Sequence, residues 1–201
     1  MLRVGLTGGL ASGKSFVGRA FEELGCLVIR NDELGHAVLK PGGEAYQGVV
    51  REFGAGILNP AGEIDRHKLA KLVFHDPGLL AKLNALVHPP VRERTRQLLA
   101  AFEAERPDGI AIVEAAILVE TGSYRNYAKL IVAMCGREQQ IERAMARDAI
   151  PREEVLERLS RQMPLEEKLK YADYAIDTSG SKEETRERVR EVYEKLRSLQ
   201  T

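Results

Sequence analysis

The chain has 201 residues, of which 44% are hydrophobic and 30% charged, a composition that excludes collagen-like, coiled-coil and low-complexity proteins. Lys plus Arg equals Asp plus Glu at 30 each, so the charge points to neither nucleic acid nor a membrane as partner, and any anion site must be local. The length fits one domain, with or without an inserted subdomain. The N-terminus enters an apolar run directly and no run approaches bilayer-spanning length, so we expect a cytoplasmic protein.

Short apolar runs alternate with helical patterns along the chain. Residues 14–24, for example, have apolar side chains on one helical face, and Gly25 suits the end of that helix. Strands alternating with helices predict an α/β fold with a parallel sheet covered on both faces. We expect its five strands at residues 2–6, 26–30, 110–113, 130–135 and 174–176.

The stretch between the second and third expected strands is helical throughout and too long for a plain crossover. Asp65 is placed to cap one helix, Asp76 with Pro77 to open a second, and residues 91–102 to form a third. Within a single domain, we therefore expect residues 35–106 to be a helical insertion into a core of residues 1–34 and 107–201. In a phosphotransferase, such an insertion commonly shapes the acceptor pocket.

Arginines crowd the two helices expected after the fourth strand, at residues 137–148 and from Pro151 to about 161. They can fold over a triphosphate as a mobile lid within residues 143–165, but each is also typical of a solvated helix surface. These arginines are Arg143, Arg147, Arg152, Arg158 and Arg161. Further on, Ser181 and Glu184 predict a capping box for the last helix.

A glycine-rich segment joins the first expected strand to the first expected helix. Its pattern of Gly8, four residues, Gly13, Lys14 and Ser15 is that of a phosphate-binding loop, whose backbone amides and following helix face the phosphates. Lys14, which we expect to be exposed on the loop, can reach the β- and γ-phosphates, and the Ser15 hydroxyl can bind Mg²⁺. The segment thus predicts phosphoryl transfer from a bound nucleoside triphosphate. The expected nucleotide-binding residues here are Gly8, Gly9, Ala11, Ser12, Gly13, Lys14, Ser15 and Phe16.

Two carboxylates follow expected strands at the edge of the sheet where ligands gather. Asp32 lies beside the loop if the second strand neighbours the first, and can accept a proton from an attacking hydroxyl. Its alternative role is to cap a helix that starts near Glu33. Glu114 can hold a Mg²⁺-bound water or, equally, pair with an arginine.

The remaining metal-ligating residue types suggest structural roles. Cys26 and Cys135 lie in apolar runs, which predicts buried free thiols. The histidines have no partners at zinc-site spacing, so we expect surface or helix-end positions for them. They are His36, His67, His75 and His88.

Taken in order, many short motifs resemble those of the dephospho-coenzyme A kinase family along nearly the whole chain. In the first half they are Gly5-Leu6-Thr7-Gly8-Gly9, Ser12-Gly13-Lys14-Ser15, Val28-Ile29 with Asp32, Phe53-Gly54 with Asn59 and Gly62, Asp65-Arg66 with Leu69, and Val73-Phe74. In the second half they are His88-Pro89, Leu118-Val119-Glu120, Gln140 with Arg143, Arg147-Asp148, Gln162, and Ala172-Asp173 before Ile176-Asp177.

The resemblance implies a three-part kinase with a nucleotide-binding core, a helical coenzyme A subdomain and a lid. Its expected reaction uses ATP and Mg²⁺ to phosphorylate the ribose 3'-hydroxyl of dephospho-coenzyme A, the last step of coenzyme A synthesis. The resemblance further implies that Asp32 is the base, that His88 and Glu120 line or support the acceptor site, and that Arg143 and Arg147 meet phosphates. We count Asp32, Lys14 and Arg143 as the expected catalytic residues.

The sequence departs from the family pattern in places. Arg30 replaces the acid usual two positions before Asp32, which argues against a two-carboxylate Mg²⁺ site there, and Phe16 replaces the threonine usual after the loop serine. The run Ala116-Ile117-Leu118-Val119-Glu120 stands for Pro-Leu-Leu-Phe-Glu, and Thr178-Ser179 stands where an asparagine is usual.

Two other function classes remain open at the level of sequence. One is another small P-loop kinase acting on a nucleoside monophosphate, shikimate or a sugar acid. The other is a nucleotide-binding switch, although the Asn-Lys-x-Asp run of guanine-specific switches does not occur. We expect a monomer or weak homo-oligomer that takes a small-molecule substrate.

Overall fold

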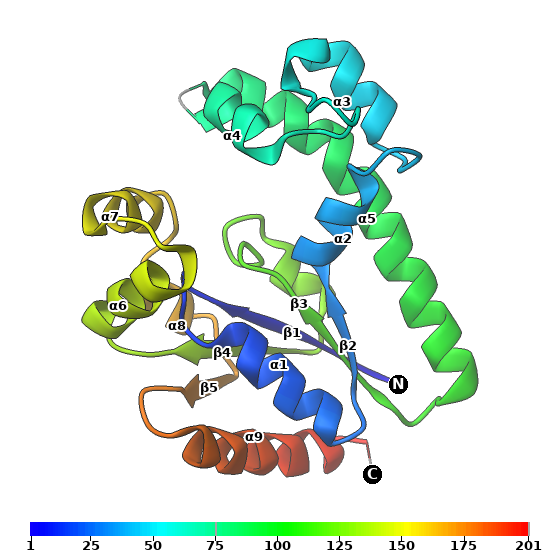
Figure 1. The fold of residues 1–201 in the computed structure, drawn as a ribbon. Helices are drawn as coiled ribbons and strands as arrows, with labels where there is room; N and C mark the ends of the chain where they lie inside the picture. Colours follow the sequence, from blue (N-terminus) through cyan, green and yellow to red (C-terminus); the bar gives the residue numbers. More distant parts are fainter. Residues whose placement is uncertain (75, 201) are drawn as a thin grey trace. The chain divides into compact units, whose positions relative to one another are not determined.

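The computed structural model describes residues 1–74 and 76–200 (Figure 1). His75 lies outside the described residues, so its expected surface position is not tested. The strands are β1 (Leu2–Gly8), β2 (Leu27–Arg30), β3 (Ile110–Glu114), β4 (Lys129–Met134) and β5 (Tyr174–Asp177). The α-helices are α1 (Lys14–Glu23), α2 (Asn31–Val38), α3 (Tyr46–Phe53), α4 (Arg66–Phe74), α5 (Pro77–Glu105), α6 (Arg137–Asp148), α7 (Arg152–Ser160), α8 (Leu165–Leu169) and α9 (Lys182–Arg197). Two short 3₁₀ turns are η1 (Ala55–Ile57) and η2 (Ser123–Asn126).

The strands form one five-stranded parallel sheet in the order β2-β3-β1-β4-β5, which confirms the predicted α/β class. Each expected strand is present within two residues of its predicted ends. The condition under which Asp32 would lie beside the loop is not met, because β3 lies between β2 and β1 and separates them. The strands beside β1, and so beside the phosphate loop, are β3, where Leu6 pairs with Glu114, and β4, where Gly8 pairs with Ala133.

Both faces of the sheet are covered, as expected for parallel strands. The alternation is clear in β4, where Ile131 and Ala133 pack in the cluster that contains α1 and α9, and Leu130 and Val132 pack towards α8. Gly25 follows α1 with a φ of +86°, in the left-handed region where glycine costs least, and so ends that helix as predicted.

The described chain divides into two compact units. The first consists of Met1–Arg30 and the residues from Ala101 onward and contains the sheet. The second unit is Asn31–Ala100, whose bounds differ by four to six residues from those of the expected insertion, 35–106. It has its own apolar core of residues such as Val49, Leu69 and Val91. Each unit is described by itself below.

Helix starts in the second unit follow the predicted caps. The Asp65 carboxylate accepts hydrogen bonds from the amides of His67 and Lys68 at 2.9 and 3.2 Å, and Asp76 caps α5 in the same way. The start of α2 differs from expectation, since the helix begins at Asn31. Asp32 is therefore inside the first turn of α2, and its alternative role as the cap before a helix at Glu33 is wrong.

The prediction of two separate helices after Asp76 is also wrong, because α5 runs unbroken from Pro77 to Glu105 through Pro89 and Pro90. Proline removes a backbone donor and normally interrupts a helix. Here, however, Leu86 before the prolines and Val91 after them pack into the same apolar core. Burial on both sides of the interruption keeps the helix continuous.

Candidate active site

The phosphate loop connects β1 to α1, and its backbone has the tight conformation that the glycines predict. Gly13 precedes α1 with a φ of +82°, and Ala11 has a φ of +53° in the left-handed region that non-glycine residues rarely adopt. A β-carbon on Gly8 would lie 2.7 Å from the carbonyl oxygen of Ala133, so this position has room only for glycine. The loop is therefore closely packed against the end of β4.

Glu114, the last residue of β3, meets the loop directly. Its Oε1 accepts hydrogen bonds from Lys14 Nζ at 2.9 Å and from the Ser15 hydroxyl at 2.8 Å. The Glu114 side chain is 4% exposed and that of Lys14 is 11% exposed. The expectation that Lys14 is exposed on the loop is thus wrong, because the neighbouring end of β3 supplies a buried carboxylate that pairs with it.

The second carboxylate oxygen of Glu114 is buried and has no hydrogen-bond partner among the described residues. Arg30 Nε lies 3.7 Å from it, beyond hydrogen-bond distance. Pairing with an arginine, one of the two roles considered for Glu114, is thus seen at ion-pair distance, and the role of holding a Mg²⁺-bound water stays a prediction. Oε1 is occupied by Lys14 and Ser15, and Oε2 is the acceptor without a hydrogen-bond partner among the described residues.

Thr178, just after β5, ties the loop to the last strand. Its hydroxyl donates to the Ser12 carbonyl at 2.9 Å. Arg143 of α6 donates in turn to the hydroxyl and carbonyl of Thr178, at 3.1 and 2.7 Å. Arg143 is therefore one residue removed from the loop, held in place by a residue that the sequence marked only as a departure from the family pattern.

The other arginines of the expected lid pair with nearby acids. Arg147 makes two bonds to the neighbouring Asp148, at 2.7 and 2.9 Å, and hydrogen bonding to this arginine lowers the pKa of Asp148. Arg158 contacts the same Asp148 at 3.2 Å and Arg152 pairs with Glu138. In this arrangement their charge is directed to carboxylates on α6 and α7, and a role at the phosphates remains a prediction.

Glu120 lies in the turn region after β3 and binds Lys168 of α8. Lys168 is fully buried, and its Nζ lies 2.7 Å from Glu120 Oε1 and donates to the Ala116 carbonyl at 2.7 Å. The Glu120 carboxylate also accepts from the Met163 amide at 3.3 Å. These contacts suit the supporting part of the role predicted for Glu120. Sequence reasoning missed Lys168, since a lysine in a charged helix has no pattern that announces burial.

The remaining predicted site residues are Phe16, Asp32 and His88. The Phe16 ring lies beneath the guanidinium of Arg186, 5.1 Å from its centroid, so this side chain contacts α9. Asp32 and His88 belong to the second unit. His88 is half-buried on α5, and burial together with the charge of Arg92 lowers its pKa, which keeps the imidazole neutral at neutral pH.

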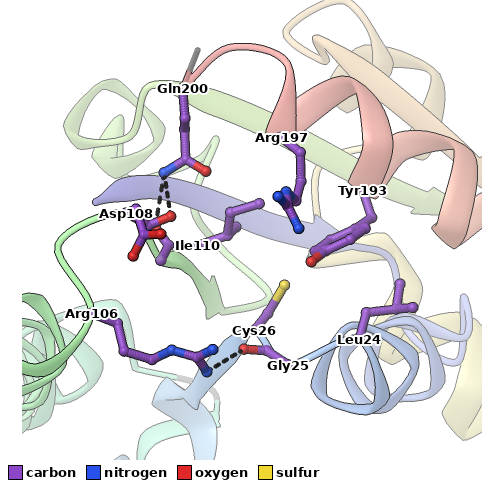
Figure 2. A pocket seen from close by; sticks show the side chains of 10 residues that line it. Leu24, Gly25, Cys26, Arg106, Asp108, Ile110, Tyr193, Arg197 and Gln200 are labelled. Carbon is purple, nitrogen blue, oxygen red and sulfur yellow. Dashed lines mark hydrogen bonds between the residues drawn. The ribbon is translucent and has the colours of Figure 1, made fainter.

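A cavity of about 240 Å³ in the first unit lies where β2 and β3 begin, at the amino ends of these strands (Figure 2). Its lining includes Cys26, which precedes β2, Asp108, which precedes β3, and Tyr193 of α9. Ligands of parallel sheets bind at the carboxyl ends of the strands, so this cavity is separate from the phosphate site. Cys26 and Cys135 are buried free thiols, as predicted, and burial raises the pKa of Cys26 to about 12.

The described residues include neither a metal-binding cluster of side chains nor a membrane-spanning helix. They contain no group of three or more His, Cys, Asp or Glu side chains arranged to hold a metal ion. The helices in the described ranges also lack the combination of length and apolar character that crossing a bilayer requires.

Comparison with known proteins gives consistent matches. The family model described as "Dephospho-CoA kinase" matches residues 2–184. The chain is 44% identical to the dephospho-CoA kinase of Aquifex aeolicus over 196 residues, covering 98% of each chain. It is 40% identical to that of Geobacter sulfurreducens over 194 residues, covering 96% of this chain and 97% of the relative.

Solved structures agree with the sequence matches. A Thermus thermophilus protein superposes with a TM-score of 0.83 at 33% identity, and the dephospho-CoA kinase of Campylobacter jejuni with 0.63 at 26%, each match covering 96% of both chains. A shikimate kinase from Bacteroides thetaiotaomicron, at 14% identity, a TM-score of 0.53 and coverage of 97% of this chain and 98% of its own, shares the fold. With a family match over most of its length and these relatives, the chain belongs to the dephospho-CoA kinase family.

Proposed function

We propose that this chain transfers the terminal phosphoryl group of ATP to the ribose 3'-hydroxyl of dephospho-coenzyme A, giving coenzyme A and ADP. The observation that carries the proposal is the contact of Lys14 and Ser15 with Glu114 at the end of β3, in a chain of this family. A cation, a hydroxyl and a carboxylate converge on a loop shaped for phosphate. Phosphoryl transfer needs these groups, because positioning of the reactants and electrostatic stabilisation of the transition state account for most of the rate enhancement.

The residues at the loop fit a magnesium ion. Ser15 offers a hydroxyl oxygen, and Glu114 offers a buried oxygen without a hydrogen-bond partner among the described residues. When bound with ATP, Mg²⁺ neutralises charge on the β- and γ-phosphates. In this proposal Ser15 holds the ion, and Glu114 orients Ser15 and accepts from the ion's water shell.

Lys14 has two partners in the course of the reaction. It pairs with Glu114 in the structure, and in the proposed reaction it contacts the phosphates and stabilises the charge of the transferring group. The positive ends of Arg143 and Arg147 meet phosphate oxygens when the segment 143–165 acts as a lid. Gly8, Gly9, Ala11, Ser12, Gly13 and Phe16 complete the nucleotide site.

The helical second unit takes the acceptor in this proposal. Asp32 accepts the proton of the 3'-hydroxyl, His88 contacts the acceptor, and Glu120, held by Lys168, supports the acceptor site. The chain then works as a monomer or weak homo-oligomer in the cytoplasm, on a small molecule rather than nucleic acid.

The test is ADP release from ATP and Mg²⁺ by the purified protein, with and without dephospho-coenzyme A, with the product mass followed in the same tube. We expect ADP only when the acceptor is present, and a product heavier by one phosphoryl group. Shikimate and a nucleoside monophosphate serve as control acceptors. Faster turnover of either control than of dephospho-coenzyme A would overturn the proposed substrate.

A further inference from the structure

The backbone amide and carbonyl of Leu10, in the phosphate loop between Gly8 and Gly13, are hydrogen-bonded by two glutamine side chains. The Leu10 amide donates to Gln162 Oε1 at 2.9 Å, and the Leu10 carbonyl accepts from Gln140 Nε2 at 2.9 Å. One glutamine therefore acts as acceptor and the other as donor. Together they satisfy both backbone groups of a single loop residue.

The two glutamines come from different segments. Gln140 lies in α6 and is 4% exposed, so its amide is a buried polar group whose bond to the loop is costly to lose. Gln162 follows α7, between that helix and α8. Leu10 is thus bonded to α6, just before the segment 143–165 expected to act as a lid, and to a residue near the end of that segment.

Apolar packing reinforces the same connection. The side chains of Leu10 and Ala11 pack against Ile141 and Ala144 of α6 and Val155 of α7. A β-carbon on neighbouring Gly9 would overlap Gln140 Nε2, so Gly9 leaves the space that Gln140 occupies. The residue after Leu10 is Ala11, whose left-handed backbone needs support from its surroundings.

We infer that Gln140 and Gln162 are positioning residues that hold the Leu10 peptide, and with it the phosphate-binding shape of the loop, against α6 and the end of α7. Their bonds keep the loop ordered before nucleotide arrives, so nucleotide binding does not have to order it. The inference rests on the proposed function only for its kinetic readout. It gives α6 and α7 a second connection to the phosphates besides their arginines.

The opposite polarity of the two bonds allows a matched test. Gln162→Glu keeps an acceptor for the Leu10 amide, whereas Gln140→Glu removes the donor to the Leu10 carbonyl. Both variants add one negative charge beside the loop, and the uncharged variants Gln140→Met and Gln162→Met separate the effect of that charge from the loss of the hydrogen bond. Gln139→Glu is the control, because Gln139 is half-buried on α6 and donates to the Ser179 carbonyl rather than to Leu10.

We expect Gln140→Glu, Gln140→Met and Gln162→Met to raise the KM for ATP and the Kd for ADP about five- to tenfold, with a smaller change in the KM for the acceptor. Gln162→Glu should stay closer to the wild type than Gln140→Glu, and Gln139→Glu should match the wild type. Equal losses in Gln162→Glu and Gln140→Glu would overturn the inference. So would wild-type ADP affinity in Gln162→Met.

Hydrogen exchange of the Leu10 amide, measured by NMR without nucleotide, tests the geometry independently of catalysis. Protection should persist in Gln162→Glu and fall at least tenfold in Gln162→Met. Unchanged protection in Gln162→Met would overturn the inference. If the wild type released no ADP in response to dephospho-coenzyme A, the proposed function would fail, while Leu10 exchange and ADP affinity would still decide the role of the two glutamines.

Discussion

The pair formed by Lys14 and Glu114 places two demands on one lysine. The Lys14 ammonium pairs with a nearly buried carboxylate, and the proposed reaction needs the same ammonium at the phosphates. Removing one partner of a buried pair leaves the other uncompensated. A change at Lys14 therefore affects stability and turnover together, and the two effects have to be separated.

A double variant separates them. We expect Lys14→Ala to lower turnover by about 10²–10³-fold or more and to destabilise the fold by about 1–3 kcal/mol. Adding Glu114→Gln removes the uncompensated charge, so the denaturation midpoint should partly recover while turnover stays low. Urea denaturation and ADP release measure the two effects. Recovery of turnover along with stability would mean that Lys14 acts only through the fold.

The acid limb of stability should depend on Asp177, at the end of β5. Hydrogen bonds from the side chain and backbone of Ser179 lower the pKa of this carboxyl below its ordinary 3.8. A lowered pKa in the folded state contributes stability above pH 3.8, and that contribution is lost as the pH falls below 3.8 through the folded value. The difference in unfolding free energy between the wild type and Asp177→Asn should therefore be constant at about pH 5–6, because this pH lies roughly one unit or more above the pKa of Asp177 in both the folded and the unfolded chain. It should shrink below pH 4 in urea titrations, and a gap that is the same at low pH would exclude Asp177 as the titrating group.

At the scale of elements, α9 shows how a local signal supports the core. The Ser181 hydroxyl accepts from the Glu184 amide and the Glu184 side chain bonds back to the Ser181 amide, so the predicted capping box is present. Behind this cap, Val189, Val192 and Leu196 pack in the core cluster beneath the sheet. Fraying of the first turn therefore weakens a helix that covers one face of the sheet.

We expect Ser181→Ala to cost about 1 kcal/mol, which for a chain of this size lowers the melting temperature by about 2–4 °C. Ser198→Ala, at the other end of α9, is the matched control. The Ser198 hydroxyl donates to the Lys195 carbonyl and has no part in the N-terminal cap, so its loss should change the melting temperature less. Calorimetry of both variants decides, and equal shifts would show that the box adds nothing beyond a surface hydroxyl.

At the scale of the molecule, the two compact units have separate cores. In the proposed function ATP binds the first unit, which contains the sheet and the loop. A ligand that binds only the folded state stabilises it, by about 2.7 kcal/mol at a hundred times its Kd. The gain in stability should be largest in the unit that binds the nucleotide.

We therefore expect ATP at that excess to raise the melting temperature by about 5–10 °C. Amides of residues 8–16 should gain the most protection from hydrogen exchange. Gly13→Ala is the control, because its β-carbon would lie 2.7 Å from the Thr178 hydroxyl at a φ of +82°. A shift of the same size in that variant would place the stabilising nucleotide elsewhere.

The sequence by itself determined the strands, the phosphate loop, the helix caps and the buried thiols, because each depends on neighbours along the chain. Hydrophobic alternation predicts a strand, and a serine three residues before a glutamate predicts a cap, whatever lies elsewhere. The ordered motifs likewise sufficed for the family. The predicted roles of Asp32, His88, Arg143 and Arg147 stay predictions.

Only the tertiary structure decided the strand order, the burial of Lys14 against Glu114 and the continuity of α5. Local patterns do not specify which parallel strand lies beside another, so they left open whether β2 neighbours β1, and the structure places β3 between them. The carboxylate nearest the loop followed from that order. Continuity of α5 through its prolines depends on a core built by other helices, and the glutamines at Leu10 reach it from residues 130 and 152 positions further along the chain, a separation at which sequence periodicity holds no information.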